Sequence, residues 1–305
     1  MKIYVAGHGG LVGSAVVRAI EATGVHTWIG QTRSQLDLLD RKSVFDFIKR
    51  EKPDWVVIAA AKVGGILANS TYPVEFLSEN LQIETNLIDA CHASKIERVL
   101  FLGSSCIYPK EAPQPIREEY LLTGPLEPTN EAYALAKISG LKLIEAYRRE
   151  YGYKWISAMP TNLYGPGDNF DLENSHVLPA LIRRFHEAKV SGATEVKLWG
   201  SGRPMREFLH ADDLARACLH LLEKYDGEIA LNVGTGSDIT ISELADKIAN
   251  VVGYKGTITW DASRPDGTMR KVLDVNRITA SGWNPEVTLD VGLAMTYKDF
   301  RENLG

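Results

Sequence analysis

The stretch Gly7-His8-Gly9-Gly10-Leu11-Val12-Gly13 decides the fold of this chain. It follows directly on the apolar run Ile3 to Ala6, which is typical of a buried strand. Behind the glycines, Val16, Val17 and Ile20 recur at the spacing of one helix face. The glycines therefore occupy the turn from a first strand into a first helix.

Each glycine of this turn has a physical role. Gly7 permits the tight turn, Gly10 lets the backbone approach a phosphate at the helix N-terminus, and Gly13 allows close packing of helix on strand. Leu11 and Val12 belong to the same helix start and are expected to contact the same ligand. In this context G-x-x-G-x-x-G predicts a site for the pyrophosphate of a dinucleotide, and a glycine turn that binds nothing is the alternative.

Strand-like runs alternate with helix-periodic segments along the first half of the chain. The runs predicted as buried strands are Ile3 to Ala6, Trp28 to Gly30, Trp55 to Ala59, Arg98 to Leu102 and Trp155 to Met159. Such strands, joined by helical crossovers, predict a parallel sheet covered on both faces. The predicted fold class is α/β, a Rossmann doubly wound parallel sheet with a smaller C-terminal α/β substrate lobe.

The same pattern suggests where the domains divide. Residues 1–165 are predicted to form the dinucleotide-binding domain, and residues 166–305 mainly the substrate-binding domain. The segment 208–235 has strand–helix–strand character and is expected to return to the first domain. Functional side chains are expected beyond the carboxyl ends of the strands, where open α/β sheets bind ligands.

The composition is that of an ordinary globular protein: 305 residues, 45% hydrophobic and 24% charged, with a formal net charge of −5. The charge shows no basic stripe, so nucleic acid is not an expected partner. No run approaches the roughly 20 apolar residues of a membrane span, and the chain starts in a strand rather than a signal peptide, so a soluble, cytoplasmic protein is expected. Cys91, Cys106 and Cys218 are too scattered for a disulfide framework or a metal site, and no metal is expected.

The end of the second predicted strand bears on the cofactor. An NAD enzyme usually carries Asp or Glu there, about 20 residues beyond the glycines, but the run Ile29 to Arg33 has neither. The guanidinium of Arg33 suits the 2′-phosphate of NADP, and a solvated loop arginine is the alternative. Asp37 and Leu38 are then expected near the adenine, unless Asp37 is a capping or turn residue.

A tyrosine and a lysine stand four residues apart on one predicted helix face. Tyr133 and Lys137 can therefore contact one ligand together, and a neighbouring ammonium favours ionisation of the phenol. Ser104 and Ser105 follow a predicted buried strand, so either could bind a substrate oxygen beside Tyr133. Taken alone, such a pair is often a surface pair and such serines are often turn residues. Their joint occurrence behind a dinucleotide site predicts a Ser–Tyr–Lys triad.

Several longer blocks carry a family resemblance: Gly7 to Gly13, Ala59 to Ile66, Gly103 to Pro109, Glu127 to Asn130, Tyr133 with Lys137, Met159 to Pro166, and Asn174 to Val177. On these blocks the chain resembles the extended short-chain dehydrogenases that modify nucleotide sugars, and among them the GDP-L-fucose synthase family, over nearly its whole length. One departure is Gly9, where the family often has Arg. Without that arginine, more of the NADP preference depends on Arg33.

The resemblance implies two sets of catalytic residues. Ser104, Tyr133 and Lys137 would form the reductase triad, while Cys106 and His176 would be the epimerisation acid and base. A 4-keto sugar has acidic C–H bonds beside the ketone, and a thiol and an imidazole, which ionise near pH 8.5 and 6.5 when unperturbed, can exchange protons there. Without the resemblance, Cys106 is a small buried side chain and His176 a helix-start or surface residue.

The resemblance also implies ligand contacts elsewhere. Pro160, Asn162, Leu163 and His176 would contact the cofactor, in addition to the glycine turn and the triad. The residues implied in substrate binding are Arg184, Trp199, Arg206 and Asp266. Their types suit a diphosphate, a base or sugar ring, and hydroxyl groups. The alternatives are a solvated Arg184 and a core Trp199.

The implied activity is NADPH-dependent conversion of GDP-4-keto-6-deoxy-D-mannose to GDP-L-fucose, by 3,5-epimerisation and then 4-keto reduction. A 4-epimerase or a reductase of a related nucleotide sugar is the alternative, and a non-catalytic NADP-sensing protein is a weaker one. A dehydratase would carry an Asp-Glu pair where Cys106-Ile107 stands. The resemblance further implies a homodimer formed by the predicted helices 72–93 and 130–149. The residues leave open which of Cys106 and His176 is the base at each carbon.

Overall fold

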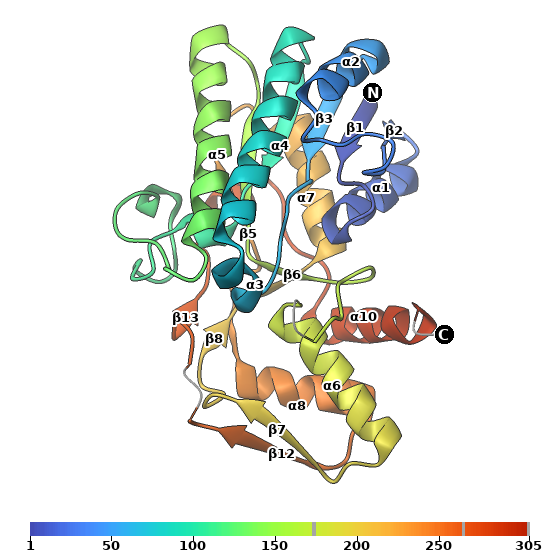
Figure 1. Ribbon diagram of the computed structural model, residues 1–305, viewed down its shortest axis with the longest axis vertical. Coiled ribbons are helices and arrows are strands. Elements are labelled where there is room, and N and C mark those ends of the chain that lie inside the picture. The colour runs from blue at the N-terminus through green and yellow to red at the C-terminus, as the bar shows by residue number, and fades with distance from the viewer. Residues whose placement is uncertain (173–174, 264–265, 304–305) are drawn as a thin grey trace.

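Six parallel strands form the central sheet in the upper lobe of the protein (Figure 1). The structure is a computed structural model and describes residues 1–172, 175–263 and 266–303. The strands of this sheet are β1 Lys2–Ala6, β2 Thr27–Ile29, β3 Trp55–Ile58, β4 Arg98–Leu102, β5 Ile156–Pro160 and β10 Leu231–Val233. The predicted α/β class with a doubly wound parallel sheet is confirmed, and the predicted strand bounds are off by one or two residues at most.

The strand order is β10-β5-β4-β3-β1-β2. The connections run in one direction from β1 to β2 and in the other from β3 onward, so the order reverses between β1 and β3. A reversal of this kind marks the crevice where open α/β sheets bind ligands. The glycine turn after β1 and the loop after β3 meet there, since Gly7 lies against the backbone of Ala60.

Helices cover both faces of the sheet, because its strands are apolar on both sides. Val56 and Ile58 of β3 pack into one hydrophobic cluster, and Val57 packs into the other. The helices on the first side are α2 Arg41–Glu51, α4 Pro73–Ala93 and α5 Glu131–Tyr151, and those on the second are α1 Leu11–Thr23 and α7 Ala211–Lys224. Cys91 and Cys218, expected to be core residues, are fully buried, one in each cluster.

The lower lobe has a hydrophobic core of its own between helices and a two-stranded parallel sheet (Figure 1). Its main elements are α6 Val177–Ser191, β7 Glu195–Trp199, α8 Ile241–Val252, β12 Thr257–Asp261 and α10 Leu289–Asn303. Between α6 and α8 the chain passes back through the upper lobe, where α7 packs on α1 and β10 pairs with β5. The crevice of the sheet therefore opens toward the second lobe.

Shorter elements lie between the longer ones along the chain. They are α3 Ile66–Thr71, η1 Ser105–Ile107, η2 Glu118–Tyr120, β6 Asn162–Tyr164, β8 Met205–Arg206, β9 Phe208–His210, β11 Ile239–Thr240, β13 Arg270–Lys271 and α9 Asn276–Ala280. Strand β6 follows β5 and leads toward α6. It pairs in parallel with β9, which leads directly into α7.

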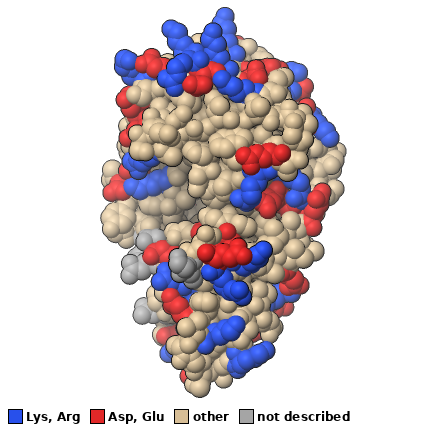
Figure 2. Space-filling model, turned by 90° about the vertical axis from the view of Figure 1, so that its right-hand side faces the viewer, with Lys and Arg blue, Asp and Glu red and all other residues tan. Residues whose placement is uncertain are grey.

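The surface is of mixed charge. On the face shown in Figure 2, acidic and basic side chains lie near one another between broad uncharged areas, and the largest group of Lys and Arg lies at the end of the upper lobe. Over the described part of the chain, no helix is long and apolar enough to span a bilayer.

Candidate active site

The glycine turn is packed so tightly that only glycine fits at two of its positions. Gly7 has φ +85°, and a Cβ there would lie 2.8 Å from the backbone of Ala60. A Cβ on Gly13 would overlap the carbonyl oxygen of Gly7. The turn therefore brings the start of α1 directly against the ends of β1 and β3, as predicted for a glycine turn that binds a dinucleotide.

The N-terminus of α1 suits a phosphate ligand. Its N-cap is Gly10, no side chain caps the first amides, and the first turn contains no acidic residue. The helix dipole and these amides are thus directed at the crevice without an internal anion. A Cβ on Gly9 would meet no atom within 4 Å. The turn therefore has room for the arginine that the family often carries at this position.

The residues predicted to discriminate the cofactor lie just beyond β2. Arg33 is exposed, and among the described residues its guanidinium has no ion pair or hydrogen bond. It is therefore free to bind a phosphate. The carboxylate of Asp37 accepts a hydrogen bond from the amide of Leu39 at 3.0 Å, which is a turn role, and the carbonyl of Leu38 accepts one from Asn86.

The predicted triad residues come from two neighbouring elements, η1 at the end of β4 and the first turns of α5. Ser104 caps η1, its hydroxyl accepts a hydrogen bond from the amide of Cys106, and it is half-buried. Ser105 is buried, so its burial favours Ser104 as the serine that meets a substrate. The ammonium of Lys137 lies 5.9 Å from the ring centre of Tyr133. Burial raises the pKa of Tyr133, and charge on Cys106 and Glu84 raises it further.

Sequence reasoning missed one charged residue of this site. Glu84 of α4 is 1% exposed, and one of its carboxylate oxygens lies 3.1 Å from the ammonium of Lys137. A signal for it exists in the sequence, because Glu84 stands in the apolar stripe of a predicted helix, four residues before Ile88 and seven before Cys91. A carboxylate in such a stripe has to find a buried cation.

The two residues that the resemblance implies for epimerisation lie on different lobes. Cys106 belongs to η1 and is half-buried, with a free thiol. His176 is the N-cap residue of α6 and is exposed, while neighbouring protein atoms still remove enough water from its ring to lower its pKa. Among the described residues no hydrogen bond joins the two. Asn174, part of the same predicted block, lies outside the described residues.

The predicted cofactor loop after β5 contacts the backbone of Glu207, a residue whose side chain is fully buried. The side chain of Asn162 donates a hydrogen bond to the carbonyl of Glu207 at 2.8 Å. Leu163 is half-buried beside the cluster of α1 and α7, and Pro160 ends β5 next to β10. Two oxygens of Glu207 accept hydrogen bonds from the amides of Thr235, Gly236 and Leu273, so this carboxylate fixes the loops around the crevice.

Of the four predicted substrate residues, the structure brings Arg184 and Trp199 together. The guanidinium of Arg184 lies 5.8 Å from the ring centre of Trp199, and Trp199 is 65% exposed, so the alternative of a core tryptophan is wrong. Arg206 lies against Gly267 and has no carboxylate partner among the described residues. Asp266 accepts hydrogen bonds from the amide and hydroxyl of Ser201, at 2.9 and 2.6 Å.

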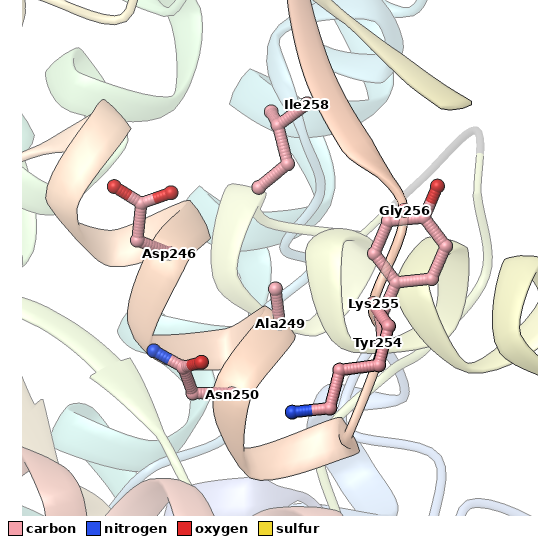
Figure 3. A pocket seen from close by; sticks show the side chains of 7 residues that line it. All are labelled: Asp246, Ala249, Asn250, Tyr254, Lys255, Gly256 and Ile258. Carbon is pink, nitrogen blue, oxygen red and sulfur yellow. The ribbon is translucent and has the colours of Figure 1, made fainter. Parts of the chain in front are cut away.

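One surface pocket of the lower lobe is lined by none of these residues. It has a volume of about 600 Å³ and is lined by residues of α8 and of the segment leading into β12, among them Asp246, Asn250 and Lys255 (Figure 3). In the close-up the carboxylate of Asp246 and the ammonium of Lys255 point in different directions. None of the predicted catalytic, cofactor-binding or substrate-binding residues lines this pocket.

Comparison with known proteins agrees with this geometry. The chain belongs to the NAD dependent epimerase/dehydratase family, whose model matches residues 3–234.

Individual proteins are similar to this chain over nearly its whole length. The chain is similar to GDP-L-fucose synthase of Escherichia coli (strain K12), at 55% identity over 99% of this chain and 97% of that protein. It is similar to probable GDP-L-fucose synthase 1 of Oryza sativa subsp. japonica, at 57% identity over 99% and 93%. Among solved structures, MlghC, a GDP-mannoheptose C4 reductase from Campylobacter jejuni with NADP bound, matches with a TM-score of 0.91 at 34% identity over 98% of each chain.

Proposed function

We propose that this protein converts GDP-4-keto-6-deoxy-D-mannose to GDP-L-fucose, by epimerisation of the two carbons beside the ketone and reduction of the ketone with NADPH. The observation that carries the proposal is the joint placement of Cys106 and Ser104 on η1 against the start of α5, where Tyr133 and Lys137 stand, in the crevice of a dinucleotide-binding sheet. The 55% identity to GDP-L-fucose synthase of Escherichia coli supports the same substrate.

The residues present fit NADPH, which would supply the hydride. The uncapped N-terminus of α1 at Gly10 would hold the pyrophosphate, and the unpaired guanidinium of Arg33 would hold the 2′-phosphate. The ammonium of Lys137 would bind the ribose hydroxyls beside Tyr133. Asn162, Leu163 and the backbone after β5 would border the nicotinamide.

In the reductive step this chain handles the oxygen of the ketone. The hydroxyl of Ser104 would donate a hydrogen bond to the carbonyl oxygen, which polarises the C=O bond. The phenol of Tyr133, kept protonated by its raised pKa, would then give its proton to the same oxygen as the alcohol forms. Lys137 would stabilise the phenolate that remains.

In the epimerisation steps this chain moves protons on carbon. Cys106 and His176 would stand on opposite sides of the sugar ring, one removing a proton beside the ketone and the other returning a proton to the opposite face. The lowered pKa of His176 favours a neutral imidazole at neutral pH, and such an imidazole is able to accept a proton.

The direct test supplies the protein with GDP-4-keto-6-deoxy-D-mannose and NADPH and follows the absorbance of the reduced nicotinamide. We expect oxidation of NADPH in proportion to GDP-L-fucose formed. Absence of oxidation by folded protein that binds NADPH would contradict the proposal.

A second candidate is reduction of a related GDP-sugar without epimerisation. It is favoured by the structural likeness to a GDP-mannoheptose C4 reductase. The two candidates differ in their use of Cys106, which a simple reductase does not need. Incorporation of solvent deuterium beside the ketone separates them, because only an epimerase removes those protons.

Arg33→Ala should weaken the preference for NADPH. Removal of the charged donor to the 2′-phosphate is expected to raise the KM for NADPH about tenfold to a hundredfold while the KM for NADH changes little. Steady-state kinetics with both cofactors measure this. The matched control is Arg50→Ala, an arginine of the same lobe that already pairs with Glu51. An unchanged NADPH/NADH ratio for Arg33→Ala would place the discrimination elsewhere.

Two adjacent arginines of α6 offer an internal comparison for the substrate. Arg184 faces Trp199 and has no acidic partner among the described residues, whereas Arg183 pairs with Glu187 at 2.7 Å. Arg184→Ala should therefore raise the KM for the GDP-sugar about tenfold or more through loss of a diphosphate contact. Arg183→Ala should leave it within about twofold, since a half-exposed ion pair contributes little. Equal effects of both would count against a substrate role of Arg184.

We further propose that the protein is a cytoplasmic homodimer. Supporting a dimer, the adjacent helices α4 and α5 expose Val74, Leu135 and Tyr151 on the outside of the upper lobe. Supporting the cytoplasm, the three cysteines are free thiols. Sedimentation at micromolar concentration tests the dimer, and a monomer there would contradict it.

A further inference from the structure

A buried ion pair lies directly behind the proposed proton donor. The ammonium of Lys137 and the carboxylate of Glu84 are 3.1 Å apart, and their side chains are 3% and 1% exposed. Among the described residues no other donor reaches either oxygen of this carboxylate. Glu84 therefore depends on Lys137 alone for compensation of its charge.

The surrounding packing fixes this carboxylate in place. Lys137 lies over the ring of Phe101, with its ammonium 4.7 Å from the ring centre. Gly140, one turn after Lys137 on α5, lies against the second oxygen of Glu84, since a Cβ there would stand 2.7 Å from it and overlap Phe101. The space around this carboxylate is thus bounded by α4, α5 and β4. A residue larger than glycine at position 140 would press on the carboxylate.

A buried ion pair of this kind contributes little net stability to the fold. Removal of two charges from water costs several kcal/mol per ion, and apolar residues of similar volume often replace a buried pair without loss of stability. Burial raises the pKa of Glu84, and Lys137 opposes that shift. The position of the pair against the active site suggests a role in catalysis instead.

The charges that face Tyr133 come from three elements. Lys137 lies on its own helix α5, Cys106 on η1, and Glu84 on α4, while β4 contributes Phe101, which carries no charge. An ammonium by itself favours the phenolate, which serves oxidation of an alcohol. A carboxylate behind that ammonium opposes this effect and favours the phenol, which is the form that gives a proton to a reduced ketone.

We propose that Glu84 is a positioning residue for the reductive step: its carboxylate holds the ammonium of Lys137 beside Tyr133 and, by its charge, keeps the phenol of Tyr133 protonated while the ketone is reduced. This rests on the proposed function. Removal of the negative charge should make Tyr133 release its proton at lower pH.

The variant Glu84→Gln tests this by pH dependence. A negative charge about 3 to 6 Å away shifts such an equilibrium by about one to two pH units, so the alkaline decline of kcat/KM for ketone reduction should move down by that amount. Exchange of solvent deuterium beside the ketone, which depends on Cys106 and His176, should retain its rate at neutral pH. That exchange also shows that the variant is folded.

Further variants separate the effect of charge from that of shape. Glu84→Asp keeps the charge and should return the alkaline decline toward that of the wild type, whereas a merely structural role would make both variants equally defective. Asp89→Asn removes a carboxylate of the same helix that pairs with Arg41, and it should leave the profile unchanged. If Glu84→Gln does not fold, Gly140→Ala displaces the same carboxylate and should move the decline in the same direction by less.

A substrate-independent measurement distinguishes this proposal from the proposed function. In protein labelled with ¹³C at the tyrosine Cζ and loaded with NADP, the resonance absent from Tyr133→Phe should titrate at lower pH in Glu84→Gln than in the wild type. Inactivity of the wild type on the GDP-sugar would overturn the proposed function alone. An unchanged titration and pH profile in Glu84→Gln, or in Gly140→Ala if only that variant folds, would overturn the role of Glu84.

Discussion

Tyr133→Phe should abolish most reduction while leaving epimerisation intact. The variant lacks only the hydroxyl that gives a proton to the ketone oxygen, and loss of a general acid slows such a step about a hundredfold to ten-thousandfold. Cys106 and His176 remain able to exchange protons on carbon. In D₂O the variant should incorporate deuterium beside the ketone and oxidise little NADPH, as mass spectrometry and nicotinamide absorbance would show.

The ring of Tyr133 contacts Phe76 edge-on, with ring centres 6.5 Å apart, and phenylalanine preserves this contact. A fall in NADPH oxidation therefore reports the missing proton and not a collapsed site. If Tyr133→Phe reduced the ketone at the rate of the wild type, another group would have to be the proton donor.

Cys106→Ser should have the opposite effect on the two half-reactions. The substitution keeps size and polarity but replaces the free thiol of η1 with a hydroxyl that hardly ionises near neutral pH. Deuterium exchange beside the ketone should fall by orders of magnitude, whereas reduction of the unepimerised ketone can continue and give a 6-deoxy sugar other than fucose.

The control is Cys218→Ala. This substitution removes a thiol of α7 that is fully buried in the core of the upper lobe, away from the crevice. It should retain exchange and product formation. Full exchange and full fucose formation by Cys106→Ser would contradict a catalytic role of Cys106 and leave it as a small residue packed behind the nicotinamide.

Much of the fold is predictable because its signals are local. The strand before Gly7 and the apolar periodicity behind Gly13 predict the first βα unit, and the tight packing of both glycines against neighbouring backbone explains why no other residue serves there. Repeated apolar strands predict the parallel sheet, since strands buried on both faces are apolar throughout.

The rest depends on contacts between distant segments. The pairing of Lys137 with Glu84 joins two helices across 53 positions of sequence, and nothing in the spacing of Tyr133 and Lys137 reveals it. The exposure of Trp199 likewise depends on how β7 is placed in the lower lobe, so its residue type alone suggested either core or ligand contact. The family resemblance identified roles for Cys106 and His176 that their local sequence does not show.

In the function proposed here, one active site both epimerises and reduces a GDP-4-keto sugar. The most direct measurement is a single incubation of the wild type with GDP-4-keto-6-deoxy-D-mannose and NADPH in D₂O, with the product analysed by NMR. We expect GDP-L-fucose that carries deuterium at carbons 3 and 5 and hydrogen from NADPH at carbon 4. A reduced product without deuterium at carbons 3 and 5, or exchange without any reduction, would contradict it.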